Sequence, residues 1–250
     1  MKKLLFILFA LLFAGSIKSQ SIKQTELEKK YEQLSAEVEN LIKNEMYNSA
    51  LEKLGVIFSL RAKNTDMEKE MYNAIYCYTR LDNQQKVIDI ANGYERIPNK
   101  TQWYAKRILL HKGFALAVVE RFNEAISALE KSIGYSEQDD FHNISQCYDL
   151  IGESYAILGN KHLAIRSYKK AIAYFCKLYN TSISQIEKVG INQPYLGYVF
   201  TKYRNVIAPT ADYKTFVYLS YLATKCGHKT IWDHTPDPSI INGHPTDLFE

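Results

Sequence analysis

Proline, glycine and cysteine are scarce in this chain, with 6, 11 and 4 copies among 250 residues. Cys77, Cys147, Cys176 and Cys226 are too few and too dispersed for a disulfide-built scaffold. They form no Cys-x-x-Cys pair that could hold zinc or do redox chemistry. Alternating strand patterns are absent as well. The sequence therefore excludes a small disulfide-rich domain.

Catalytic and phosphate-binding motifs are also absent. The sequence has no Gly-rich phosphate loop, no Gly-x-Ser-x-Gly elbow and no His-Glu-x-x-His helix. Five residues near the C-terminus could in principle ligate a metal, but their spacing fits no motif: Asp233, His234, Asp237, His244 and Asp247. We therefore expect a protein that is not an enzyme, with no cofactor and no metal. A hydrolase built on these His and Asp residues is the remote alternative.

Excess charge is small once the N-terminus is set aside. Lys2, Lys3 and Lys18 belong to the first 19 residues, and without them 28 basic residues face 27 acidic ones. No Lys/Arg cluster stands out on any one segment, so nucleic acid is not expected as a partner.

Residues 1–19 have the order of a secretory signal peptide. Lys2 and Lys3 precede an apolar run over residues 4–14, and small and polar residues lead to Gln20. The run is well short of the ~20 residues that a membrane-spanning helix needs. We predict cleavage after Ser19 and a mature protein without a membrane span, in a bacterial periplasm, secreted or at the cell surface. A retained anchor is the alternative.

From about residue 25 to residue 208, apolar residues recur at three- and four-residue intervals, as on helices with one buried face. Short polar segments interrupt this pattern, and several offer an Asn, Asp or Thr that can cap the next helix. The pattern predicts paired helices of roughly 12–18 residues with short connections.

One segment, residues 148–171, combines aromatic, apolar and small residues in a specific order: Tyr148, Ile151, Gly152, Tyr155, Gly159, Ala164, Tyr168 and Ala171. It resembles a tetratricopeptide repeat (TPR), a hairpin of two helices. Gly152 and Ala164 would be small because the helices cross closely, and Gly159 would allow the reversal between them.

Weaker copies precede this segment. The small residues of successive second helices are Ala50, Val87, Ala125 and Ala164. Their spacing of 37 to 39 residues exceeds the usual repeat of 34. The resemblance implies an all-α, right-handed helical-hairpin solenoid of about five hairpins with a C-terminal capping helix.

This interpretation divides the chain into four segments: a signal peptide (1–19), the repeat array (20–208), a capping helix (209–231) and an irregular tail (232–250). Near the end, Phe216, Ser220 and Ala223 fit the first helix of a further hairpin, 68 residues after the fourth unit. The tail is expected to fold back through its apolar residues, with a flexible tail as the alternative: Trp232, Ile240, Ile241 and Phe249.

The resemblance to TPR proteins implies a concave groove lined by the first helix of each hairpin. The family's groove positions fall on Lys69, Tyr72, Tyr76 and Thr79, on Arg107, Leu110, Phe114 and Ala117, and on Gln146, Asp149, Glu153 and Ala156. This set predicts an aromatic wall beside an acidic patch, suited to a peptide with apolar and basic side chains. The alternative is that the aromatic residues pack between repeats.

The function that the resemblance implies is binding of a protein or peptide partner, with a structural subunit of a cell-envelope assembly as the alternative. Asp149 and Glu153 replace the Lys and Asn with which some TPR proteins grip a C-terminal carboxylate, so that mode is not expected. Cys147 and Cys176 would share one hairpin and could form a disulfide, the alternative being two buried thiols.

Overall fold

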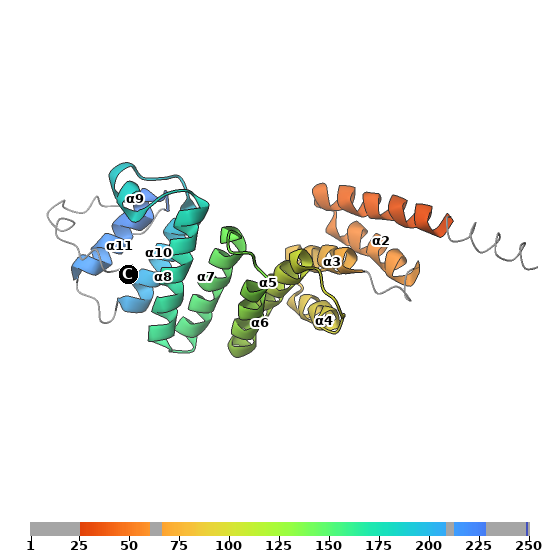
Figure 1. Cartoon of the computed structure of the whole chain (residues 1–250), viewed down its shortest axis with the longest axis horizontal. Helices are drawn as coiled ribbons and strands as arrows, with labels where there is room; N and C mark the ends of the chain where they lie inside the picture. Colours follow the sequence, from red (N-terminus) through yellow and green to blue (C-terminus); the bar gives the residue numbers. More distant parts are fainter. Residues whose placement is uncertain (1–25, 61–66, 209–212, 229–248, 250) are drawn as a thin grey trace, which may run out of the picture. The chain divides into compact units, whose positions relative to one another are not determined.

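The computed structural model describes residues 26–60, 67–208, 213–228 and 249. These residues form helices and no strand (Figure 1). A helix over residues 26–43 is followed by α2 (Tyr47–Leu60), α3 (Glu68–Arg80), α4 (Gln84–Tyr94), α5 (Gln102–Val118), α6 (Phe122–Gly134), α7 (Phe141–Ile157), α8 (Lys161–Leu178), α9 (Ile183–Val189), α10 (Pro194–Ile207) and α11 (Tyr213–Lys225). The predicted all-α array of helical hairpins is confirmed, whereas the leader at 1–19 lies outside the described residues.

The chain forms two compact units, Met1–Asn83 and Gln84–Glu250. In the first unit, α2 packs against α3 and buries Ala50, Leu54 and Ile57. Tyr31, on the helix over residues 26–43, donates a hydrogen bond of 2.5 Å to the buried Glu70 of α3. The second unit contains α4 to α11 and carries the best-preserved repeat.

The repeat register predicted from small residues is confirmed. Ala50, Val87, Ala125 and Ala164 are each the fourth residue of their helix, and each is fully buried. A small or β-branched side chain at this point lets the second helix of a pair approach its neighbours closely.

The turn before each of these helices has one backbone geometry. Glu45, Asp82, Glu120 and Gly159 adopt positive φ values of 58°, 56°, 62° and 74°, each five residues before the small residue. In each turn, the backbone N–H of the next residue donates a hydrogen bond to the carbonyl five residues earlier in the preceding helix. One example runs from Arg121 N–H to the Leu116 carbonyl at 2.8 Å. This is a Schellman motif, which satisfies the free carbonyl groups at a helix end.

Two glycines mark the close crossings inside hairpins. A Cβ at Gly152 of α7 would lie 2.9 Å from Cδ1 of Tyr168 on α8, and one at Gly113 of α5 would lie 2.4 Å from Cγ of Leu129 on α6. Both pairs are separated by 16 residues. The third and fourth hairpins therefore share one packing scheme.

The last hairpin differs from the sequence prediction. We expected α11 to be the first helix of a hairpin, but α10 lies next to both α7 and α8 and pairs with α11. Gly197 of α10 faces α11, where an added Cβ would lie 2.7 Å from the Ala223 carbonyl oxygen. The 68-residue offset was therefore misleading, because the helix α9, inserted between α8 and α10, lengthens this part of the chain.

Phe249 lies against the core of this last hairpin. Its ring packs edge-on to Phe200 at 5.9 Å and to Tyr203 at 6.4 Å between ring centroids. At this residue the chain end contacts α10, as the folded-back tail requires. Trp232, Ile240 and Ile241 lie outside the described residues.

Candidate functional site

The first helices of the last three hairpins, α5, α7 and α10, form the candidate site. Within the second unit, α7 contacts both α5 and α10. We call the outward surface of these three helices the helix-A face. It has two joints, one between α5 and α7 and one between α7 and α10.

On α5, apolar side chains remain in solvent along one stripe. Trp103 is 43% exposed, Phe114 37% and Val118 49%. The guanidinium of Arg107 lies 4.0 Å from the centroid of the Trp103 ring. Residues four apart lie one above the other on a helix, so the stripe presents an arginine stacked on an aromatic surface. Leu110 is half-buried and packs against the core below the stripe.

On α7, the predicted acidic patch is occupied by α10. Lys202 Nζ lies 3.0 Å from Asp149 Oδ2 and 2.8 Å from Glu153 Oε2, and Tyr195 donates a hydrogen bond of 2.7 Å to Asp149. Asp149 is fully buried, whereas 43% of the Glu153 side chain is exposed. We call these four residues the Lys202 cluster.

Burial and charge act against each other in this cluster. Burial raises the pKa of Asp149 above its usual value, although the neighbouring Lys202 ammonium and Tyr195 phenol offset part of this effect. Burial alone would lower the pKa of Lys202, yet the charges of Asp149 and Glu153 raise it above its usual value. The pair therefore serves as a satisfied ion pair between α7 and α10.

This geometry corrects the chemistry expected of the groove. Asp149 faces α10 instead of solvent, and Lys202 pairs with both carboxylates, which leaves one negative charge among the three side chains. The acidic patch is therefore smaller than expected, with Asp149 buried and Glu153 partly exposed. Gln146 is half-buried on α7, and Ala156 lies near the end of the same helix.

The remaining groove residues from the sequence lie on α3, in the first unit, and contact the preceding hairpin. Lys69 Nζ pairs with Glu39 at 2.5 Å, and the Tyr76 ring meets Tyr47 edge-on at 6.2 Å between centroids. Tyr72 is half-buried on the same helix. Packing within the first unit therefore accounts for Tyr76 and Lys69, in line with the alternative of structural aromatic residues.

Two residues of the helix-A face were not identified from the sequence. Tyr198 of α10 is 43% exposed, with Lys202 Nζ 4.7 Å from its ring centroid. It follows Gly197 just as Phe114 follows Gly113 and Glu153 follows Gly152. A glycine facing the partner helix, followed by an outward side chain, is a signal that could have identified α10 as a first helix. Trp103 could have been found from its four-residue spacing to Arg107.

A pocket of about 400 Å³ opens at the far end of the joint between α7 and α10. Its lining is mainly apolar: Ala156, Ile157, Gly159, Lys161, Asn205 and Val206. Ile157 is 59% exposed there. The volume is within the range of pockets that hold small apolar groups.

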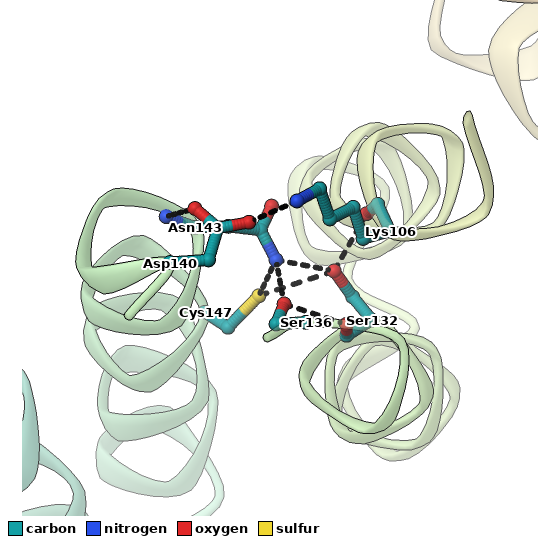
Figure 2. Close-up of polar contacts among 6 residues, drawn as sticks. All are labelled: Lys106, Ser132, Ser136, Asp140, Asn143 and Cys147. Atoms are coloured by element: carbon teal, nitrogen blue, oxygen red, sulfur yellow. Dashed lines mark hydrogen bonds and ion pairs between the residues drawn. The ribbon is translucent and has the colours of Figure 1, made fainter. Parts of the chain in front are cut away.

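Figure 2 shows a second polar cluster, buried between α5, α6 and the start of α7. Asn143 donates to the hydroxyls of Ser132 and Ser136 at 3.0 and 2.8 Å, and the Cys147 thiol donates to Ser132 at 3.5 Å. The Lys106 ammonium pairs with Asp140 at 2.5 Å. The cluster fixes three helices relative to one another.

The cysteine of this cluster is not activated as a nucleophile. Burial raises the pKa of Cys147 to about 12, so its thiol stays protonated near neutral pH. Cys147 and Cys176 are both free and buried in the structure, which corresponds to the alternative to a disulfide.

The described part of the chain shows no metal-binding group and no membrane-spanning helix. No group of three His, Cys, Asp or Glu side chains there could hold a metal ion. Asp233, His234, Asp237, His244 and Asp247 lie outside it. Within the same ranges, no helix has both the length and the apolar character to cross a bilayer.

Comparison with known proteins gives the fold. No protein-family model matches the chain, and no curated protein sequence matches it. Among solved structures, "MamA RS-1 ArsTM double mutant" is similar with a TM-score of 0.59 and 14% identity, covering 79% of this chain and 94% of that one. "MamA 41-end from Desulfovibrio magneticus RS-1" is similar with a TM-score of 0.54 and 15% identity, covering 78% and 96%. MamA is TPR-like, so the chain has a TPR-like fold.

Proposed function

We propose that this protein is a non-enzymatic interaction module that binds a peptide segment of a partner protein along the helix-A face of α5 and α7. The TPR-like fold supports this function, since such arrays present extended binding surfaces. The observation that carries the proposal is Arg107, stacked 4.0 Å above the exposed Trp103 and without a carboxylate partner among the described residues. Exposed aromatic and arginine side chains are the residue types that dominate binding energy.

The chemistry of the ligand follows from the charge of this stripe. The guanidinium of Arg107 has no carboxylate beside it in the described part of the chain, whereas the carboxylates of Asp149 and Glu153 on α7 are both paired with Lys202. A carboxylate on the ligand would satisfy Arg107 with a charge-assisted hydrogen bond. The bound segment therefore carries an acidic residue where the sequence alone suggested a basic one.

Spacing on α5 sets where the ligand's apolar side chain falls. Arg107 and Phe114 are seven residues apart, or ~10 Å along the helix. An extended chain covers about that distance in three residues. We expect an Asp or Glu with a large apolar residue three positions away, and a further apolar residue that reaches Val118 or the pocket beside Ile157.

Selection from a random peptide library tests this proposal and requires no identified partner. The mature chain is immobilised, and the enriched peptides are sequenced and measured for affinity. We expect enrichment of an acidic residue followed or preceded at three positions by an aromatic or aliphatic one. Arg107→Met and Phe114→Ala should each weaken binding about tenfold or more.

A matched control is Lys214→Met on α11, which removes one cation away from the helix-A face. It should leave peptide affinity unchanged. Enriched peptides that bind the Arg107→Met and Phe114→Ala variants as tightly as the original protein would contradict the proposal.

We also propose that the protein acts after export, in the periplasm or at the cell surface. The support is the leader-like order of residues 1–19. N-terminal sequencing of the protein from its own host should begin at Gln20, and an intact Met1 would contradict export by cleavage.

A further inference from the structure

Helix α8 has a charge imbalance that the peptide-binding face does not explain. Its sequence carries Lys161, Arg166, Lys169, Lys170 and Lys177 and no acidic residue, and α10 and α11 have no acidic residue either. The near-neutral charge of residues 20–250, with 28 basic and 27 acidic residues, hides this local excess at the level of the sequence. The imbalance calls for an anionic partner that is not part of the proposed function above.

The cations of α8 gather on one outward stripe. Arg166, Lys170, Ala173 and Lys177 follow one another at four, three and four residues, the spacing of a single helix face. Arg166, Ala173 and Lys177 are exposed, and Lys170 is half-buried. We call these four residues, with the adjacent Lys169, the basic stripe.

Aromatic rings hold two of these cations in place. Lys170 Nζ lies 4.7 Å from the ring centroid of Tyr148 and donates a hydrogen bond of 3.3 Å to its hydroxyl. Lys177 Nζ lies 4.9 Å from the centroid of Tyr174. The rings of Tyr148 and Tyr174 are themselves stacked, 5.9 Å apart with an angle of 19°. The two ammonium groups are thus held by neighbouring rings, on lysines whose backbones lie about two helical turns apart, ~10 Å.

The cations of the basic stripe lack carboxylate partners in the described part of the chain. No ion pair there involves Arg166, Lys169, Lys170 or Lys177. In contrast, Lys106, Lys112 and Lys202 each have an acidic partner. The two lysines held by rings, Lys170 and Lys177, are preorganised for an anionic surface, because they have less side-chain entropy to lose on binding.

The chemistry of the stripe discriminates between anionic partners. It exposes no large apolar side chain that could insert into a bilayer, since Ala173 is the only apolar residue on it. Tyr148 and Tyr174 stack on each other and lie under lysines, so their faces are not open to nucleic-acid bases. Carboxylates on a neighbouring helix repeat with the same three- and four-residue spacing as the cations.

We propose that the basic stripe of α8 docks an acidic helix of a partner protein. Glu or Asp residues at successive turns of that helix pair with Arg166, Lys170 and Lys177, and the small Ala173 between them allows the two helices to approach closely. This surface lies on a second helix of a hairpin, and Arg107 and Phe114 of the helix-A face take no part in it.

Fluorescence anisotropy with a labelled helical peptide tests the proposal on the full mature chain. The probe carries Glu with alternating three- and four-residue spacing, and a scrambled peptide of the same composition is the reference. We expect the patterned peptide to bind more tightly than the scrambled one. The triple variant Arg166→Gln, Lys170→Gln, Lys177→Gln should lose about tenfold in affinity, as three partly exposed ion pairs are removed.

The control removes the same charge elsewhere, through Lys29→Gln, Lys30→Gln, Lys43→Gln on the exposed surface of the helix over residues 26–43. It should bind the patterned peptide as the original chain does, and circular dichroism should show both triple variants to be folded. Equal loss in the two triple variants, or equal affinity for the two peptides, would overturn the proposal. Tighter binding of the original chain to single-stranded DNA or to anionic lipid vesicles than to the patterned peptide would also overturn it. Arg107→Met should not affect this probe, which separates the two surfaces.

Discussion

The two joints of the helix-A face are built on the same packing scheme and differ in what fills them. Between α7 and α10, the Lys202 cluster closes the surface with a buried carboxylate, an ammonium and a phenol. Between α5 and the start of α7, the ion pair of Lys106 and Asp140 does not involve the helix-A face. On that face of α5, Trp103 and Phe114 are exposed and Arg107 is half-buried. The charged side chains at the joint between α7 and α10 pair with one another, whereas α5 presents the exposed side chains that we propose contact a ligand.

The largest effect should come from breaking the closed joint. Lys202→Met removes the cation that pairs with the fully buried Asp149, so we expect a loss of about 3–5 kcal/mol in the free energy of unfolding. Urea unfolding followed by circular dichroism measures this loss. The double variant with Asp149→Asn should recover part of it, and a loss below about 1 kcal/mol in the single variant would contradict the role given to the cluster.

A smaller loss of stability is expected when the pH is lowered, because of His111 on α5. Burial, with a contribution from Arg107, lowers the pKa of His111 on α5 to about 4, below the ~6.5 of an unfolded chain. A depressed pKa means that the unfolded state binds the proton first as pH falls. The contribution of His111 to the free energy of unfolding should therefore be fully present above pH 6.5. It should fall toward pH 4 by about 1–2 kcal/mol for this partly exposed residue.

The urea midpoint at pH 7 and pH 4.5 measures this dependence, with His111→Gln as the reference. The variant should show a weaker fall than the original chain. An identical fall in both proteins would mean that His111 does not contribute.

Substitutions in the turns that follow α5 and α7 should change stability in opposite directions. Glu120 after α5 holds a φ of 62°, whereas Gly159 after α7 holds 74°. Glu120→Gly should stabilise the protein by about 0.5–1 kcal/mol because the strain is relieved, and Gly159→Ala should destabilise it by about 1 kcal/mol. No atom lies within 4 Å of a Cβ added at Gly159, so steric clash is not involved. Thermal unfolding of the two variants gives the comparison.

The smallest effect on stability is expected at Arg107. Arg107→Met removes a cation lying over a partly exposed ring, which contributes about 0.5–1 kcal/mol. This is far less than the loss expected for Lys202→Met, although both variants remove one cation from the helix-A face. If urea unfolding gives similar losses for the two, the contrast between an open and a closed joint is wrong.

Much of the array could be predicted from the sequence because its packing depends on small residues at regular spacing. Ala50, Val87, Ala125 and Ala164 placed four second helices correctly, since close crossings tolerate few side chains. The last hairpin was assigned wrongly because the inserted α9 breaks the spacing on which the comparison depended.

The site was harder to predict, because helix periodicity tells which face a residue occupies and not which neighbour reaches it. Asp149 was placed on the correct helix, but Lys202, 53 residues later, neutralises it through a contact that no local pattern reveals. Phe114 was expected on the outward face of its helix and is exposed there, whereas Arg107 is half-buried beside Trp103. The turn at Glu120 was missed because glycine is the usual signal of positive φ.

The central claim is that a peptide ligand binds at Arg107 on α5. The fluorescence of the neighbouring Trp103 tests this claim most directly. In a Trp232→Phe background, Trp103 is the only remaining tryptophan, and it lies beside the guanidinium proposed to bind the ligand. A peptide obtained by library selection should produce a saturable change in Trp103 emission that disappears in Arg107→Met. If the peptide binds, as anisotropy would show, and Trp103 emission does not change, the ligand lies elsewhere and the account of the open joint is contradicted.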